Sequence, residues 1–225
     1  RGAGTSQSGQ SIGKGLMIDT SRYLDDLLDF DPAARRVVVR PGLVLDQLNT
    51  FLRPHGLFFP IDVATSSRAT LGGMAGNNSA GSRSIRYGHM VEHVRGIEAV
   101  LASGERVWFG VNRQGNSLTN DKTWIPEANP PSAHLISDVQ AIFEREATEL
   151  EQRVPKVPRH VAGYALHRLG KAQPRFSDLL VGSEGTLADF TAPELDLQPI
   201  PRPQALGVCR FNSNQAALAA VHDIV

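Results

Sequence analysis

The chain has 225 residues, of which 41% are hydrophobic and 20% charged, and its 23 basic residues balance its 23 acidic ones. This composition is that of a globular protein of one domain, or of one large domain and part of another. Zero net charge gives no basic surface for nucleic acid, and no apolar run approaches the roughly 20 residues of a membrane span. The single Cys209 excludes an internal disulfide and an iron–sulfur cluster held by this chain alone, and we expect a cytoplasmic location.

The first elements are two short strands and a helix. GLMID (15–19) has the apolar pattern of a short buried strand, and RRVVVRPG (35–42) indicates a second strand that stops at Pro-Gly. Residues 43–56 predict an amphipathic helix that ends at Pro54 and Gly56. Its apolar face carries Val44, Leu45, Leu48, Phe51 and Leu52.

The middle of the chain predicts a hairpin, a loop and a longer helix. IEAVLASGERVWF (97–109) has the alternation of a hairpin with Ser103-Gly104 at its turn. The polar residues 110–131 are typical of a loop, and residues 132–152 predict a second helix. Its apolar stripe consists of Leu135, Val139, Ile142, Phe143 and Leu150.

The last part of the chain indicates a domain boundary. Residues 178–197 predict a strand, a glycine turn and another strand, and PIPRP (199–203) is typical of a linker. ALGVCRF (205–211) then predicts a strand. A helix from Asn214 follows, with Asn212 or Ser213 as its N-cap.

The chain opens with RGAGTSQSGQ, a run of small residues rich in backbone N–H groups and hydroxyls. It is not the dinucleotide-binding G-x-G-x-x-G turn, because Gln7 stands at the third glycine and no strand precedes it. It is not a P-loop either, because Gln10 replaces the lysine that reaches the phosphates. What remains is a flexible terminal tail or a nest of N–H groups suited to a pyrophosphate.

A second glycine-rich stretch is TLGGMAGNNSAGSRSIRYG (70–88). Its simplest interpretation is a surface loop. Apolar residues are spaced through it, and a long segment with such anchors is more often functional than idle. These anchors are Leu71, Met74, Ile85 and Tyr87.

These motifs occur in the order RGAGTSQSGQ, IDTS, VRPG, PIDVATSSRATLGGMAGNNSAGSRSIRYG, EAVLASGE and LLVGSEGTL. In this order they resemble the FAD-binding domain of the flavin-linked oxidases and dehydrogenases. That family includes D-lactate dehydrogenase, the glycolate oxidase flavoprotein subunit and D-2-hydroxyglutarate dehydrogenase. The resemblance implies an α+β fold, with a two-subdomain FAD-binding domain over residues 1–198 that lacks its N-terminal subdomain. Residues 199–225 would begin a truncated α+β cap domain.

The resemblance also implies the cofactor site. The opening loop would cradle the FAD diphosphate, and three later segments would lie along the cofactor. Val63 replaces a proline that the family carries, and ADFT after GSEGTL departs from the family's usual residues. Thr5 stands where members with covalently attached flavin have a histidine, which implies non-covalent FAD. The implied cofactor-binding residues are Gly2, Ala3, Gly4, Thr5, Ser6, Gly9, Pro60, Asp62, Thr65, Thr70, Gly72, Gly73, Asn78, Gly81 and Gly185.

KVPRHVAGYALHRL (156–169) is similar to a family element on the substrate side of the flavin. This similarity implies that Arg159, Tyr164 and His167 face the substrate carboxylate. The alternative is that Tyr164 belongs to the core and that the basic residues form a solvated edge. Ala162 replaces the hydroxyl residue that is usual there. The family places its acid/base groups and metal ligands in the cap, so no catalytic residue is assigned in this chain.

The function implied by the resemblance is oxidation of a small D-2-hydroxy acid by hydride transfer to FAD, with an electron acceptor that the sequence does not identify. A non-catalytic nucleotide- or anion-binding module is the first alternative. The second is a zinc hydrolase, because HMVEH (89–93) satisfies H-x-x-E-H. That motif needs a helix and a third ligand, and neither is evident. Because the chain begins inside the pyrophosphate loop, we expect it in isolation to bind FAD weakly, to be inactive and to self-associate through the edge strand at 15–19.

Overall fold

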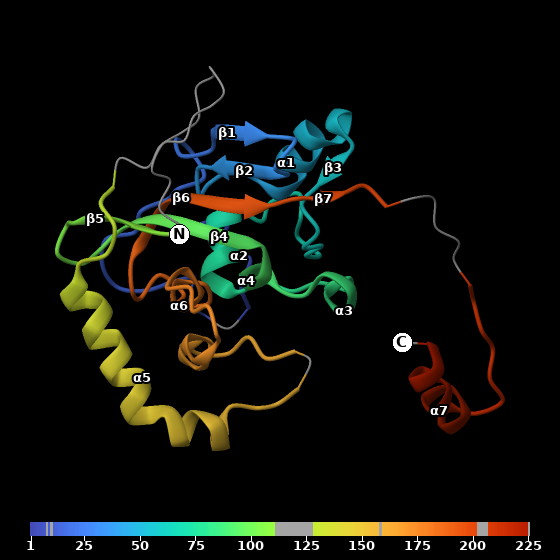
Figure 1. Cartoon of the computed structure of the whole chain (residues 1–225). Helices are drawn as coiled ribbons and strands as arrows, with labels where there is room; N and C mark the ends of the chain where they lie inside the picture. Colours follow the sequence, from blue (N-terminus) through green and yellow to red (C-terminus); the bar gives the residue numbers. More distant parts are fainter. Residues whose placement is uncertain (8, 10, 111–127, 158, 202–206, 225) are drawn as a thin grey trace.

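A five-stranded antiparallel sheet is the centre of the structure, a computed structural model that describes residues 1–225 except 8, 10, 111–127, 158, 202–206 and 225. Its strands lie in the order β1-β2-β6-β4-β5, so β6, from the last third of the chain, lies between two strands of the first half (Figure 1). The strands are β1 (Leu27–Asp31), β2 (Arg36–Val39), β4 (Val94–Val100), β5 (Arg106–Phe109) and β6 (Asp189–Asp196).

A two-stranded sheet and several short helices complete the mixed α and β fold. The small sheet pairs β3 (Leu57–Phe58) with β7 (Gln198–Pro199). Helices α1, α2, α4 and α6 lie beside the main sheet, whereas α5 runs along the outside of the molecule (Figure 1). The helices are α1 (Leu45–Leu52), η1 (Arg53–His55), α2 (Leu71–Asn77), α3 (Ser84–Tyr87), α4 (Met90–His93), α5 (Ala133–Arg153), η2 (Leu166–Gly170), α6 (Ser177–Leu180) and α7 (Asn214–Ile224).

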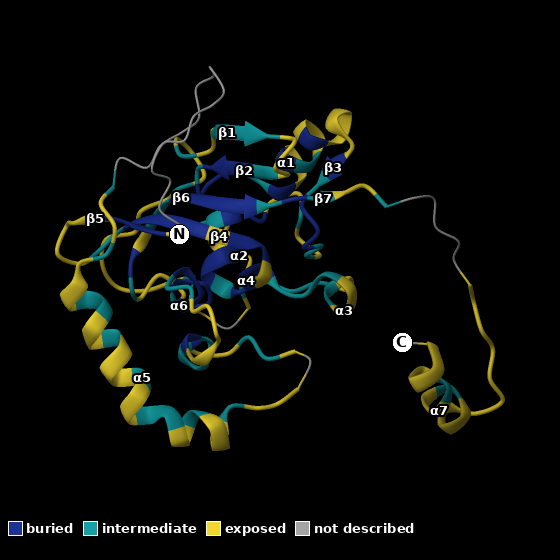
Figure 2. Ribbon diagram, in the orientation of Figure 1, coloured by how far each residue is buried: buried dark blue, intermediate teal, exposed yellow. Residues whose placement is uncertain are grey.

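The hydrophobic core lies between one face of the sheet and helices α1, α2, α4 and α6. Alternate residues of the strands point into it, such as Val37 and Val39 of β2 and Ile97 of β4, all at most 1% exposed. Figure 2 shows this layer as buried, whereas α5 and α7 carry no buried residue. The core therefore holds α2 and α4 firmly against the sheet.

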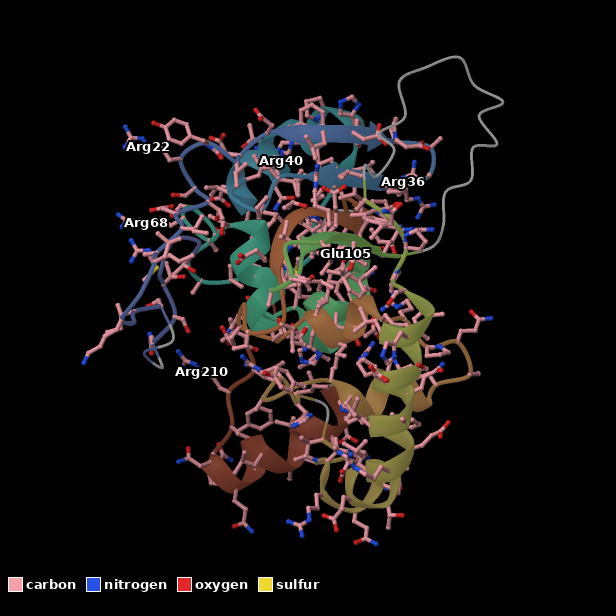
Figure 3. All side chains as sticks on the ribbon, turned by 90° about the vertical axis from the view of Figure 1, so that its left-hand side faces the viewer. Arg22, Arg36, Arg40, Arg68, Glu105 and Arg210 are labelled. Atoms are coloured by element: carbon pink, nitrogen blue, oxygen red, sulfur yellow. The ribbon has the colours of Figure 1, made fainter. Side chains whose placement is uncertain are left out.

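The opposite face of the sheet is charged. Arg36 Nε lies 3.3 Å from Glu194 Oε1, and Arg106 Nη2 lies 2.7 Å from the buried Glu98. Arg40, at the end of β2, donates from Nη1 to Thr191 O over 3.2 Å; Figure 3 shows Arg36 and Arg40 near opposite ends of this strand. Ion pairs across the strands compensate these charges, which is the condition under which burying charge is tolerated, although Arg36 Nε and Glu98 Oε2 have no hydrogen-bond partner among the described residues.

Most of the elements that the sequence predicts are present. Residues 35–42 contain β2, residues 43–56 contain α1 and η1, and the hairpin at 97–109 is formed by β4 and β5. Helix α5 matches the prediction over 132–152. Helix α7 has Ser213 Oγ accepting from Ala216 N, which selects Ser213 as the N-cap. The loop predicted at 110–131 lies largely outside the described residues, because 111–127 are not described.

Three strand predictions were wrong. Residues 15–19 form no strand, and Leu16 is 91% exposed, because no described strand pairs with them; in the described part of the chain, Ile18 O accepts only from the Arg1 amino group. Residues 178–180 belong to the short helix α6, where Asp178 is held by arginine side chains. Residues 207–211 have no regular structure, and 205–206 lie outside the described part. A strand needs a partner, and an apolar run alone does not supply one.

Candidate functional site

A cavity of about 600 Å³ collects segments from three distant parts of the sequence. Its walls are the opening loop with residues 16–18, the helix α2 with the residues around it, and the segments 159–161 and 184–190. The volume falls within the range of about 300–1,000 Å³ that is typical of small-molecule and cofactor pockets. The cavity is therefore large enough for a ligand that contacts all three walls.

The opening loop offers a row of unpaired donors to this cavity. In the described part of the chain, the backbone N–H groups of residues 2–6 donate no hydrogen bond. Gly4 has φ +67°, a conformation that lets the loop turn back on itself. Arg1 O accepts from Thr20 N over 3.1 Å and fixes the start of the loop. Such a turn of free N–H groups is suited to binding an anion.

The loop lies directly on the start of α2. A Cβ added to Gly2 would come within 2.2 Å of Thr70 Oγ1, a distance that no real side chain tolerates. Thr70 is the N-cap of α2, and its Oγ1 accepts from Gly73 N over 3.3 Å. Glycine at position 2 is thus required for the observed distance between the loop and the helix.

Helix α2 does not itself offer free donors at its N-terminus. Leu71 N donates to Leu43 O and Gly72 N donates to Pro41 O, at 2.9 and 2.8 Å. Gly73 N is bound by Thr70, as described above. An anion in this cavity would therefore be bound by the opening loop, with α2 as a surface on which the loop rests.

The opposite end of α2 carries the third wall. Gly182 N donates to Ala75 O and Glu184 N donates to Gly76 O, each over 2.9 Å. Asn77 Nδ2 also donates to Glu184 Oε1 over 2.8 Å. These bonds hold the turn at 182–186 against the last carbonyl groups of α2 and place Gly185, with φ +76°, on the cavity surface.

The cavity brings together many of the predicted cofactor residues but not all of them. Gly9, Pro60, Asp62 and Gly81 do not line it. Asp62 accepts from Arg83 N over 3.0 Å, and a Cβ on Gly81 would lie 2.1 Å from Asp62 Oδ1, so these two residues pack on each other. The predicted residues that line the cavity are Gly2, Ala3, Gly4, Thr5, Ser6, Thr65, Thr70, Gly72, Gly73, Asn78 and Gly185.

Besides lining the cavity, Asn78 has a structural role that was not predicted from the sequence. It ends α2 in a left-handed conformation, with φ 48° and ψ 54°. Its side-chain Oδ1 accepts from Val91 N over 3.1 Å, which connects α2 to α4. Asparagine tolerates this backbone conformation better than other non-glycine residues.

The structure separates the three residues predicted to face a substrate carboxylate. Arg159 is exposed and lines the first cavity, the one beside the opening loop. Tyr164 OH lies 2.7 Å from Thr186 Oγ1 and lines neither this cavity nor the second one. His167 lines a second cavity, between α5 and η2. Burial and the nearby His160 and Arg168 lower the pKa of His167.

The HMVEH residues make contacts within the fold, and Met90–His93 form the short helix α4, which the sequence had not made evident. His89 N donates to Glu92 Oε2 and caps the four-residue α4, and His93 Nε2 lies 2.7 Å from Tyr87 O. Burial raises the pKa of Glu92, but the His89 N–H and Arg168 outweigh it, so the net pKa is lowered. In the described ranges, no group of three or more histidine, cysteine or acidic side chains could hold a metal ion.

Arg168 joins α4, η2 and α6 through ion pairs. Its Nη1 lies 2.8 Å from Glu92 Oε1, and its Nε lies 2.7 Å from Asp178 Oδ2. Arg175 Nη2 approaches the other oxygen of Asp178 at 2.7 Å. The Asp178 side chain is only 2% exposed, so two arginines share one buried carboxylate.

We expect Asp178→Asn to lower the free energy of unfolding by about 3 kcal/mol, because removing one partner of a buried ion pair leaves the other charges unpaired. Asp138, 60% exposed beside His134 on α5, provides the matched control. Asp138→Asn should change the same quantity by less than about 0.5 kcal/mol. Urea unfolding of both variants measures the difference, and equal midpoints would contradict the role given to Asp178.

Some residues at the cavity carry no sequence signal for it. Glu184, Asn77 and Pro41 reach the cavity through contacts between distant segments. Leu16, Met17 and Ile18 line it as exposed side chains, although their pattern predicted a buried strand. The apolar run at 16–18 does not by itself indicate a cavity wall. It does so only when the position of the neighbouring opening loop is known from the structure.

Comparison with known proteins identifies the domain that contains this cavity. Residues 1–110 match the family model of the FAD binding domain. The chain is 36% identical to D-2-hydroxyglutarate dehydrogenase of Pseudomonas putida over 97% of its own length and 21% of that protein. It is 26% identical to glycolate oxidase subunit GlcD of Bacillus subtilis, over 100% of this chain and 37% of the relative.

Two further comparisons agree with this result. D-2-hydroxyglutarate dehydrogenase of Escherichia coli is 32% identical, again over 97% of this chain and 21% of that protein. The chain thus spans about a fifth of the length of these dehydrogenases. A solved structure of alkyldihydroxyacetonephosphate synthase shares the fold, with a TM-score of 0.56 at 16% identity over 90% of this chain and 27% of the other.

The described helices include none with the length and apolar character needed to cross a bilayer. The opening loop, α2 and most of the first cavity's walls lie inside the matched range. Residues 1–110, just under half of the chain, match the FAD binding domain family.

Proposed function

We propose that this chain is the FAD-binding part of an oxidoreductase that oxidises a small D-2-hydroxy acid. The names of the relatives at 32–36% identity support this substrate class. The observation that carries the proposal is the row of unpaired N–H groups at residues 2–6, held over Thr70 at the edge of a cavity of about 600 Å³.

The residues present fit FAD. The free N–H groups and hydroxyls of Gly4, Thr5 and Ser6 match the oxygen-rich diphosphate, which needs donors rather than a hydrophobic wall. Close approach of the loop to α2 requires the absent side chain of Gly2. Apolar residues such as Leu16 and Met17 offer surface to a flat ring system. When bound, FAD supplies the acceptor for the hydride of the substrate α-carbon.

The chain's own part is to bind and orient. Residues 2–6 would hold the diphosphate, and Gly185 would leave room for the cofactor beside the turn at 182–186. Arg159 would attract the substrate carboxylate with a fixed positive charge that is available at any physiological pH. Together these contacts would set the distance between the two reactants, which is a large part of what an enzyme contributes.

Anaerobic addition of D-2-hydroxyglutarate or D-lactate to the purified, FAD-loaded enzyme that contains this chain tests the proposal. We expect the yellow flavin absorbance to be lost on mixing with the substrate and to return with an added electron acceptor. The L enantiomers serve as matched controls and should leave the colour unchanged. Stable FAD binding without bleaching by any D-2-hydroxy acid would favour a non-catalytic nucleotide-binding module instead.

We further expect the flavin to be bound without a covalent bond. Thr5 lines the cavity, and a threonine hydroxyl cannot form the bond to the flavin ring that a histidine makes. Precipitating the protein with acid should therefore release all of the flavin into the supernatant. Colour that stays in the washed pellet, when FAD mixed with an unrelated protein is removed by the same washes, would contradict this expectation.

A further inference from the structure

A second cavity, also of about 600 Å³, lies between the outer helix α5 and the 3₁₀ helix η2. The two elements meet where Gly170 faces the ring of Phe143, which a Cβ on Gly170 would approach to 3.0 Å. Glu92 of α4 and His89, the residue that precedes this helix, also line it. His160 belongs to this cavity, whereas its neighbours Arg159 and Val161 line the first one, so the segment 159–161 is a wall between the two.

The charges around this cavity do not balance locally. Arg168 is matched by Asp178 and Glu92, and Lys156 is matched by Glu151. Among the described residues, no carboxylate lies within ion-pair distance of His160, His167 or Lys171. The rings of His160 and His167 have their centroids 5.9 Å apart. Three groups that can carry positive charge thus share one cavity without acidic partners.

Their titration reflects this crowding. Burial, His160, Arg168 and Lys171 lower the pKa of His167, although Asp178 acts in the opposite direction. Burial, Arg168 and Arg175 lower the pKa of Lys171, and they outweigh Asp178 and Glu92, which act in the opposite direction. Positive charge placed here is repelled by its neighbours, and a bound anion is what would relieve that repulsion.

We propose that this second cavity binds a small dianion whose oxygen atoms accept hydrogen bonds from His160, His167 and Lys171. Inorganic phosphate, sulfate, a phosphate ester and a dicarboxylate share this chemistry. A dianion of this kind offers several acceptor oxygens to the three donors that line the cavity, whereas an apolar ligand offers none. The site is distinct from the first cavity and does not depend on FAD binding there.

Protonation decides how tightly the anion is held. The other titratable or charged groups that line the cavity are His89, which precedes α4, Glu92 from α4, Glu151 from α5, Lys156 from the following segment and Arg168 from η2. The carboxylates of Glu92 and Glu151 are already paired and stay charged near neutral pH. His167, whose pKa is lowered by burial and by the nearby positive groups, gains a proton as the pH falls, so binding should tighten on acidification.

Titration of the protein with sodium sulfate, followed by the NMR signals of the histidine rings, tests this proposal. Sulfate is a dianion at every pH of the experiment, so any pH dependence belongs to the protein. We expect the signals of His160 and His167 to move on addition of sulfate, and the pKa of His167 to rise. His134 and His222 are exposed and outside both cavities, and they serve as internal controls that should move no more than with sodium chloride of equal ionic strength.

A variant tests the site without the need to assign NMR signals to individual histidines. Lys171→Gln should weaken sulfate binding about tenfold, because it removes a charge-assisted donor. Lys171 is exposed, so the protein should still fold. Lys14→Gln, at an exposed lysine outside both cavities, is the matched control and should leave the affinity unchanged.

The result also identifies the source of the anion. If the His160 and His167 signals move with sulfate or phosphate but not with succinate, the site prefers a phosphate-like ligand. If they move with succinate only, the site prefers a dicarboxylate. Either pattern supports the site. Unchanged His160 and His167 signals with both classes, or equal sulfate affinity of Lys171→Gln and the parent, would overturn it.

Discussion

Replacing Gly2 by alanine is expected to weaken FAD binding at least about tenfold, whereas alanine at Gly13 should leave it unchanged. The added methyl group of Gly2→Ala would lie 2.2 Å from Thr70 Oγ1, but nothing lies within 4 Å of a Cβ at Gly13. Neither glycine has a positive φ, so the comparison isolates the steric effect from backbone strain.

The clash with Thr70 has no cheap solution. If Thr70 rotates, α2 loses the side-chain cap on Gly73 N, which costs about 1 kcal/mol. If the opening loop moves instead, its free N–H groups leave the edge of the cavity. Each route separates the proposed diphosphate donors from the surface of α2 on which they rest.

The double variant Gly2→Ala/Thr70→Ala sharpens the test. Without Oγ1, the nearest atoms to the new methyl group are at 3.5 Å, which is ordinary contact. In a Thr70→Ala background, Gly2→Ala should therefore cost much less FAD affinity than in the parent, a non-additive result. Fluorescence titration with FAD gives the affinities. Equal losses in the two backgrounds would show that Gly2 acts by some other means.

Local patterns in the sequence were sufficient where an element is defined by its own residues. The valines of β2, the apolar face of α1 and the Ser-Gly turn between β4 and β5 each occur as predicted. In α1 the pattern was right even though Phe51 is 42% exposed, because Leu45, Leu48 and Leu52 alone provide the buried face.

Prediction was wrong where a distant contact decides the structure. The run DLLV has the composition of a buried strand, yet Arg168 and Arg175 hold Asp178 at the start of a helical turn. Residues 15–19 have strand composition, but no described strand pairs with them. In both cases intrinsic preference is weaker than the tertiary environment.

The candidate site shows the same division. The resemblance carried by the order of the glycine-rich motifs implied that the opening loop, residues 70–81 and the turn at Gly185 form one site, and the first cavity is lined by residues of all three. The helix α2 within residues 70–81 was not predicted. Which of Arg159, Tyr164 and His167 reaches that cavity could not be predicted. Their side chains diverge because Tyr164 is turned toward Thr186 and His167 lies in η2, and only the folded chain fixes these directions.

The divergence of these side chains leads to the last prediction: Arg159→Gln should lower kcat/KM for a D-2-hydroxy acid about 10- to 100-fold. A charge-assisted hydrogen bond contributes roughly 1.5–3 kcal/mol, which corresponds to that range. Arg159 is the one of the three candidates that lines the first cavity, and in the described part of the chain no carboxylate is paired with it. Its guanidinium is therefore available to a substrate carboxylate.

Arg145→Gln is the matched control, since Arg145 is 70% exposed on α5, pairs with Glu146 and lines neither cavity. FAD content should be equal in both variants and the parent, because the proposed diphosphate donors lie on the opening loop. If Arg159 binds the ground-state carboxylate, KM rises and kcat changes little; if it mainly orients the reacting carbon, kcat falls as well. Arg159→Lys keeps the charge without the planar pair of donors and should recover part of the loss. Wild-type kcat/KM in Arg159→Gln would show that the substrate carboxylate is bound by other residues.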